Sequence, residues 1–143
     1  MLIREFERGD YASWLPLWQE NCEYKISDDV TAQTWQRLTH KAQKVHGLGL
    51  FNSDEVMIGF LHYILHPTTG CFNDACYMQD IFIATEHRGQ GLAKRLMWEL
   101  QDVRKKQNWS RIYWFAENSN LAAQNLYKTL GMKLDFSLHM ILD

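Results

Sequence analysis

Long apolar runs and a secretory leader are missing from this sequence. None of its apolar runs approaches the roughly 20 residues that a membrane-spanning helix requires. The first seven residues include two glutamates, where a secretory signal needs an apolar stretch. The three cysteines form no CxxC pair, and their odd number favours a reducing compartment over a disulfide framework. We therefore expect a cytoplasmic protein without a membrane partner.

Metal-ligand motifs and an excess of positive charge are also missing. The six histidines show no HExxH spacing, and scattered histidines are more often surface or core residues than metal ligands. The formal net charge of −2 argues against a nucleic-acid partner, because such proteins usually carry a basic excess. These absences predict no metal site and no nucleic-acid interface.

The composition that is present suits a packed domain. Hydrophobic residues make up 46% of the chain and charged residues 22%, which favours a folded core over disorder. A length of 143 residues fits one domain of ordinary size. No internal repeat, low-complexity tract or linker divides the chain, so we expect a single domain over residues 1–143.

Apolar periodicity predicts alternating strands and helices. Strand-like patterns occupy residues 2–6, 48–52, 56–65, 71–83, 111–115 and 133–142. Helical spacing follows the candidate caps Asp10 and Thr31, and it is clearest from Leu92 onward. A fourth helix is predicted after Asn118 or Ser119, up to Gly131. The sum is an α/β or α+β fold.

A glycine turn, Arg88-Gly89-Gln90-Gly91-Leu92-Ala93, joins the strand at 77–83 to the third predicted helix. Such a turn leaves backbone N–H groups without partners at the positive end of the helix dipole, which favours an anion. Glycine allows a phosphate to approach the backbone closely, and Arg88 and Lys94 can add charge-assisted hydrogen bonds. A plain strand-to-helix turn that binds nothing is the alternative.

Of three known phosphate-binding loop patterns, one fits this segment. A GxxxxGK[ST] loop does not occur in the chain, and counting a dinucleotide fingerprint from Gly89 puts Lys94 where a third small residue belongs. Arg88, Gly91 and Ala93 do match Q/R-x-x-G-x-G/A. The segments 77–83 and 86–91 therefore resemble the core of the GNAT N-acetyltransferase superfamily.

A second string strengthens this resemblance. Asn120, Ala123, Leu126 and Tyr127 are similar to the family's N-x-x-A-x-x-L-Y helix, although Met132 stands where the family has Phe. The two motifs span residues 77–132. The strands at 77–80 and 113–115 look most like the branch that holds histone, polyamine and diamine acetyltransferases.

The resemblance implies a fold and an acetyl-CoA site. The fold is a mixed central sheet of about six to seven strands flanked by about four helices, and homodimers are common in the family. Acetyl-CoA would lie between splayed parallel strands at 77–83 and 111–115, with the Ile83 N–H facing the thioester oxygen. The implied cofactor-binding residues are Ile81, Phe82, Ile83, Arg88, Gly89, Gln90, Gly91, Leu92, Ala93, Lys94, Asn120, Ala123 and Tyr127.

Acetyl transfer to an amine also needs proton transfer. An alkylammonium must first lose a proton, which costs roughly 3.4 pKa units at pH 7, or about 4.6 kcal/mol. Related polyamine acetyltransferases carry a Glu nine residues before the loop arginine, but Gln79 stands there and cannot act as a base. Asp80 is adjacent, although strand alternation points it to the opposite face unless a bulge intervenes. Asp80 as base and Asp80 as a structural carboxylate both remain open.

Tyr127 is the other catalytic candidate. Its phenol stays protonated at pH 7 and can donate to the leaving CoA thiolate, whereas the alternative is an ordinary core tyrosine.

The acceptor is less clearly encoded. We expect Tyr24, Glu23 and Gln79 near it, and an acidic, aromatic lining would favour a polyamine or lysine-like amine. The further acceptor-side candidates are Glu20, Asp28, Asp29, His62 and His66. A non-catalytic acyl-CoA-binding module is the alternative function, because Gln79 replaces the expected base.

Overall fold

A five-stranded sheet organises the residues that the computed structural model describes, which are 1–131 and 133–142. Its strands lie in chain order, and β1–β2, β2–β3 and β3–β4 are antiparallel pairs, while β4–β5 is parallel. The strands are β1 (Leu2–Glu5), β2 (Val45–Phe51), β3 (Met57–His66), β4 (Ala75–Ile83) and β5 (Ile112–Tyr113). This mixed sheet confirms the predicted fold class.

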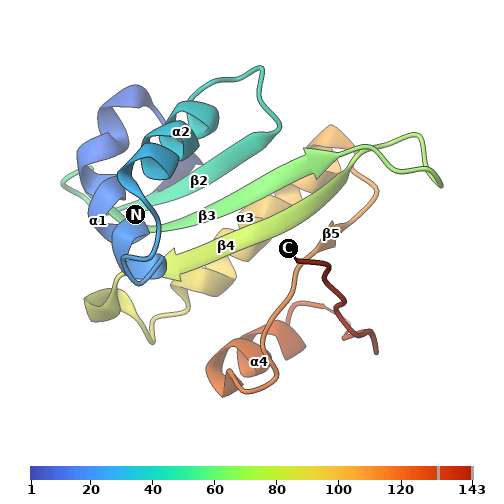
Figure 1. Cartoon of the computed structure of the whole chain (residues 1–143). Helices are drawn as coiled ribbons and strands as arrows, with labels where there is room; N and C mark the ends of the chain where they lie inside the picture. Colours follow the sequence, from blue (N-terminus) through green and yellow to red (C-terminus); the bar gives the residue numbers. More distant parts are fainter. Residues whose placement is uncertain (132, 143) are drawn as a thin grey trace.

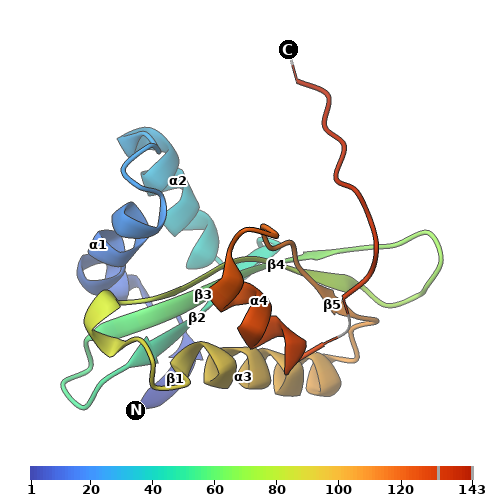
Figure 2. The ribbon, with the colours of Figure 1, turned by 90° about the horizontal axis from the view of Figure 1, so that it is seen from below.

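Helices cover both faces of the sheet. Figures 1 and 2 show α1 (Tyr11–Asn21) and α2 (Asp28–Leu38) on one face, and α3 (Leu92–Gln107) along the other. The short α4 (Leu121–Lys128) lies beyond the β4 side of the sheet (Figure 1). No helix of the described residues is long and apolar enough to cross a membrane.

Each face has its own core. The α3-side core joins the helical stripe Leu92, Leu96, Met97 and Leu100 to inward residues of β2, β3 and β4. Helical spacing predicted these four positions together with Ala93 and Val103, which are partly buried against the same core. The α1-side core is aromatic and contains Phe6, Trp14, Leu17, Trp18, Leu38, Phe51, Met57, Phe60, Phe82 and Ala84.

The start of α2 differs from the sequence prediction. Ser27, not Thr31, is the N-cap, and its hydroxyl accepts from the Val30 N–H. Thr31 instead lies inside the helix, where its hydroxyl accepts from the Trp18 indole at 3.1 Å. Because that indole N–H is buried and needs an acceptor, the hydrogen bond fixes α2 against α1.

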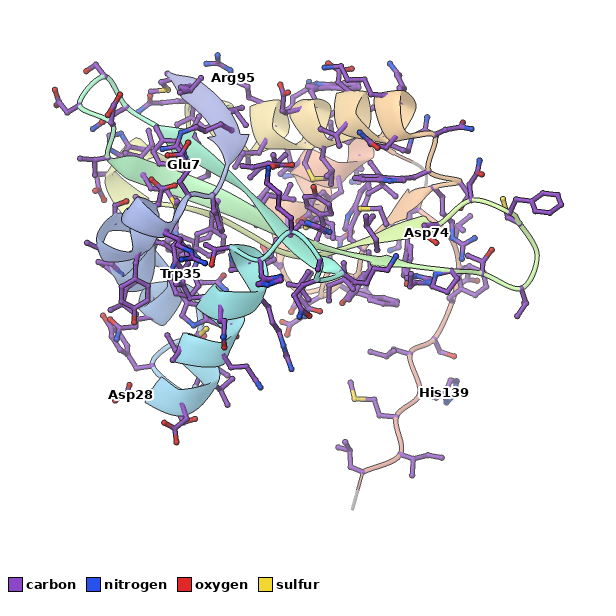
Figure 3. All side chains as sticks on the ribbon, turned by 90° about the horizontal axis from the view of Figure 1, so that it is seen from above. Glu7, Asp28, Trp35, Asp74, Arg95 and His139 are labelled. Carbon is purple, nitrogen blue, oxygen red and sulfur yellow. The ribbon has the colours of Figure 1, made fainter. Side chains whose placement is uncertain are left out.

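The strand count is lower than the predicted six to seven, and the last predicted strand accounts for part of the difference. Residues 133–142 are extended but belong to no strand, and Leu134, Phe136, Leu138 and Met140 are exposed. Figure 3 shows His139 on this segment, well apart from the body. Alternation makes a strand only where a neighbouring strand offers a ladder, and β5, the last strand of the sheet, is two residues long. Met132 lies outside the described residues.

Candidate active site

Strands β4 and β5 separate soon after they meet. Their parallel pairing joins only Cys76 to Ile112 and Tyr77 to Tyr113, while β4 continues to Ile83. Beyond Tyr77, the ladder partner of β4 among the described residues is β3 alone. The structure therefore has the separating parallel strands that the family resemblance implied, although β5 is shorter than the expected 111–115.

Two amide groups of β4 face this open edge. The Ala84 N–H donates to the Ile58 carbonyl at 2.9 Å, which points it toward β3. Because successive N–H groups along a strand point to opposite edges, Phe82 shares that direction, whereas Ile81 and Ile83 point the other way. The edge beside β5 thus presents two backbone donors, at positions where a ligand could pair as another strand would.

The glycine turn that follows β4 takes a left-handed backbone. Gly89 has φ +75° and Gly91 has φ +73°, and Gly91 is the N-cap of α3 without a side-chain capping hydrogen bond. A Cβ at either glycine would meet no atom within 4 Å, so these glycines are required by backbone angle and not by crowding. The first N–H groups of α3 are left to face open space at the positive end of the helix.

Arg88 braces this loop against the end of β4. Its Nε donates to the Ile83 carbonyl at 2.9 Å, and its guanidinium lies 5.2 Å from the centre of the Phe82 ring. Lys94 and Arg95 follow in the first turn of α3. The Arg95 guanidinium donates to the Met1 carbonyl at 3.4 Å, so Arg88 and Lys94 are the cations at the turn. Unpaired amides, left-handed glycines, open space and these two cations together fit a pyrophosphate.

The N-cap of α4 is Asn120, two residues after Asn118 and one after Ser119, the two predicted caps. The Asn120 Oδ1 accepts from the Ala123 N–H at 3.1 Å, so two motif residues form the cap together. Neither earlier residue could cap this helix, because a capping side chain must reach the N–H groups of the first turn.

Tyr127, about two turns after Asn120, packs against the α3-side core. Its ring centre lies 5.2 Å from that of Trp114. Burial raises the pKa of its phenol, so the hydroxyl is a proton donor at neutral pH. The structure therefore places a protonated phenol on the α3 side of β4, where α4 lies against the core.

A β-bulge at Gln79 decides the direction of Asp80. Tyr63 pairs with Met78 and His62 pairs with Asp80, so Gln79 is an extra residue in β4. Met78 consequently faces the α3-side core, while Asp80, two residues on, faces α1. Regular alternation would have put both side chains on one face.

Asp80 is held by two neighbouring side chains. Its Oδ2 lies 3.1 Å from His62 Nδ1, and its Oδ1 accepts from the Asn21 amide at 3.4 Å. On the far side of the imidazole, Trp14 Nε1 donates to His62 Nε2 at 3.1 Å. His62 is buried, whereas 21% of the Asp80 side chain remains exposed. Asp80 is therefore a carboxylate held by two neighbouring side chains, with lone pairs left to accept a proton.

His62 was a sequence candidate for the cleft, but Asn21 and Trp14 were not. Nothing in their local sequence marks them, because the contact depends on how α1 crosses β3 and β4. The bulge is the one feature of this arrangement that the sequence analysis names, as the way in which Asp80 could change face.

The acidic lining predicted from the early loop does not assemble. Glu23 pairs with Lys25, which lowers its pKa, and Tyr24 is 75% exposed. Asp28 and Asp29 lie in the first turn of α2, and Figure 3 shows Asp28 at its outer end. Only Glu20 reaches the end of β4, where its carboxylate accepts from the Thr85 hydroxyl at 3.0 Å.

Aromatic rings gather where β4 and β5 begin to separate. Tyr77 stacks on Tyr113 with ring centres 5.2 Å apart, and Phe115 meets both rings edge-on. The Tyr113 hydroxyl lies 2.7 Å from His66 Nε2, so His66 supports this aromatic group from β3 and does not face Asp80.

An open-edged mixed sheet beside a glycine-capped helix is the arrangement that the sequence resemblance implied for an acyltransferase. The family model described as Acetyltransferase (GNAT) family matches residues 5–132, and the chain belongs to this family. It is therefore a GNAT-type acetyltransferase.

Curated relatives and solved structures are consistent with this family. The chain is 24% identical to D-amino-acid N-acetyltransferase HPA3 of Saccharomyces cerevisiae, over 97% of this chain and 89% of that protein. It is 28% identical to thialysine N-epsilon-acetyltransferase of Sus scrofa, over 93% and 84%. The ribosomal-protein-alanine N-acetyltransferase of Brucella melitensis superposes with a TM-score of 0.82 at 22% identity, over 100% of both chains. The aminoglycoside N-acetyltransferase AAC(6')-Iy with CoA gives 0.83 at 18%, over 99% and 93%. These two likenesses show the fold.

Proposed function

We propose that the protein transfers an acetyl group from acetyl-CoA to a primary amine, with Asp80 as the base. The observation that carries this proposal is the supported, partly exposed Asp80 carboxylate, which the Gln79 bulge turns toward α1 beside the open edge of β4. Two relatives support it, because their names describe acetylation of an amino-acid amine and of the ε-amine of thialysine.

The donor half of the site is the open edge of β4 and the glycine turn. Acetyl-CoA, when bound, supplies the thioester that the amine attacks. The N–H groups of Ile81 and Ile83 suit its pantetheine arm and thioester oxygen, with Phe82 between them. The amides of Gly89, Gln90, Gly91, Leu92, Ala93 and Lys94, with the Arg88 side chain, suit its pyrophosphate. Asn120 and Ala123, from the start of α4, remain candidate contacts of the cofactor.

The reaction breaks the C–S bond and forms a C–N bond. The ammonium of the acceptor loses one proton to reach the attacking amine form and a second as the amide forms, and Asp80 passes these protons to solvent. Tyr127 donates the proton that the departing thiolate takes up, and then recovers one from solvent. Asp80 on the α1 side and Tyr127 on the α3 side would flank a thioester placed on the edge of β4.

A lysine-like or other alkyl amine fits the acceptor half best. Burial and then the charge of Asp80 raise the pKa of the Tyr77 phenol, so the carboxylate acts electrostatically on this ring. The stacked rings of Tyr77, Tyr113 and Phe115 can hold an alkylammonium by cation–π contact. Glu23 is already paired, so a polyamine would find less negative charge here than the sequence suggested. Tyr24, Glu23 and Gln79 remain candidate residues at the rim of the acceptor site.

The test is consumption of acetyl-CoA with a panel of D- and L-amino acids, thialysine, lysine peptides and diamines. Turnover on a primary amine is expected, together with tight acetyl-CoA binding in calorimetry. Tight binding without turnover on any amine would instead establish an acyl-CoA-binding module, and absence of binding would overturn both functions. The expected homodimer stays a prediction that sedimentation can test.

A further inference from the structure

His62 occupies the position directly behind the Asp80 carboxylate. We propose that His62 is a positioning residue: it holds Asp80 through Nδ1–H, while Trp14 fixes which ring nitrogen carries the proton. This inference rests on the proposed role of Asp80 as the base.

The hydrogen bond from Trp14 determines the histidine tautomer. An indole N–H can only donate, so His62 Nε2, 3.1 Å away, must accept and carries no proton. The ring proton of the neutral imidazole is therefore on Nδ1, 3.1 Å from Asp80 Oδ2, where it donates to the carboxylate. Turning the ring over would place C–H groups against both partners and lose both hydrogen bonds.

Aromatic neighbours hold the imidazole in this orientation. It stacks on Phe60 with ring centres 4.3 Å apart and planes 15° from parallel, and it meets Phe6 edge-on at 5.8 Å. Trp18 covers it at 5.4 Å, and only 2% of the residue is exposed. A ring so enclosed keeps one rotamer, so its Nδ1–H marks a fixed point for the carboxylate.

Asn21 completes the support from the other side. Its amide contacts Oδ1 while His62 contacts Oδ2, so donors from α1 and β3 together fix the plane of the Asp80 carboxyl group. Two rigid supports leave the base no need to reorganise when an amine arrives, which is the advantage of a positioned catalytic group.

The other titratable groups around Asp80 do not compete for its role. Burial and then the charge of Asp80 raise the pKa of the Cys22 thiol in α1 to about 11. The same two causes raise the pKa of the Tyr77 phenol in β4. At neutral pH both groups are therefore protonated and uncharged, so neither can act as the base in place of Asp80.

The experiment compares two substitutions of His62 that each keep one of its hydrogen bonds. Asparagine places its amide near Nδ1, so His62→Asn can still donate to Asp80. Glutamine reaches the position of Nε2, so His62→Gln can still accept from Trp14 but no longer supports the carboxylate. Urea unfolding and acetyl-CoA affinity, measured for both, report the fold and the donor half independently of Asp80.

We expect His62→Gln to lower kcat about tenfold or more while the KM for the amine stays within about twofold, because the base loses the donor that orients it but the surface that binds the amine is kept. His62→Asn, which keeps that donor, should retain most of the wild-type kcat. An equal loss of kcat in both variants, or an unchanged kcat in His62→Gln, would overturn the positioning role.

A measurement on the wild-type protein covers the case in which the variants do not fold. Long-range ¹H–¹⁵N spectra should show His62 protonated on Nδ1 and bare on Nε2. An Nε2–H tautomer would overturn the inference. An Nδ1–H tautomer together with no turnover on any amine would instead overturn the proposed function, and the base role of Asp80 with it, so the two failures are distinguishable.

Discussion

The two halves of the site are built from different parts of the chain. The donor half is almost all backbone: the amides of Ile81 and Ile83 and the turn through Gly89 and Gly91, from one continuous stretch. The acceptor half is almost all side chain, with Asp80 from β4, His62 from β3 and Asn21 from α1. A backbone site depends on local conformation, whereas a side-chain site depends on register and packing. The variants below should therefore separate binding of the donor from chemistry on the acceptor.

Asp80→Asn should have the largest effect. The amide cannot accept a proton, so kcat should fall by about a thousandfold, within the usual range for loss of a general base. Acetyl-CoA affinity, measured by calorimetry, should stay within twofold, since the donor half is untouched. Asp54→Asn, in the turn after β2, is the matched control. A loss of acetyl-CoA affinity equal to the loss of kcat would show that the two halves are not separate.

Tyr127→Phe should lower kcat about a hundredfold, because the thiolate would leave without its proton donor. Burial raises the pKa of this phenol above its usual value near 10, so its donor capacity should persist through neutral pH and be lost only above that value. The basic limb of the kcat profile measures this. Tyr63→Phe removes a phenol from the same core away from the open edge and should leave kcat unchanged.

Gly91→Ala should act on the donor half alone. An alanine at φ +73° costs about 1 kcal/mol and tilts the first amides of α3, so acetyl-CoA should bind about tenfold more weakly. Gly70→Ala, at a glycine without a positive φ and with open space, is the control. Unchanged affinity in Gly91→Ala would refute the assignment of this turn to the pyrophosphate.

Asn120→Ala should have the smallest effect. Loss of an N-cap costs about 1 kcal/mol, here confined to a helix of eight residues. Hydrogen exchange of the α4 amides should accelerate, with little change in the global unfolding midpoint. Asn118→Ala, at one of the two caps that the sequence suggested, should leave that exchange unchanged. Faster exchange in Asn118→Ala, with unchanged exchange in Asn120→Ala, would show instead that Asn118 caps the helix.

The sequence predicted the local structure of the proposed donor half well because its signals are local. The start of α3 at Leu92, its buried stripe and the glycine turn follow from helical spacing and glycine chemistry. The surroundings of Asp80 in the proposed acceptor half could not be predicted from the sequence. They depend on the Gln79 bulge and on the crossing of α1 over β4, which tertiary packing determines. Period-two apolarity also failed at 133–142, where the pattern alone cannot supply a strand neighbour.

A crystal structure with CoA and a turned-over amine would test the two-part site most directly. The account predicts the pyrophosphate on the amides from Gly89 to Ala93, and the amine nitrogen about 2.6–3.2 Å from an Asp80 carboxylate oxygen or one water away. Asp80 should retain its contact with His62 in that complex. An amine bound away from Asp80, or a pyrophosphate bound away from the glycine turn, would contradict it.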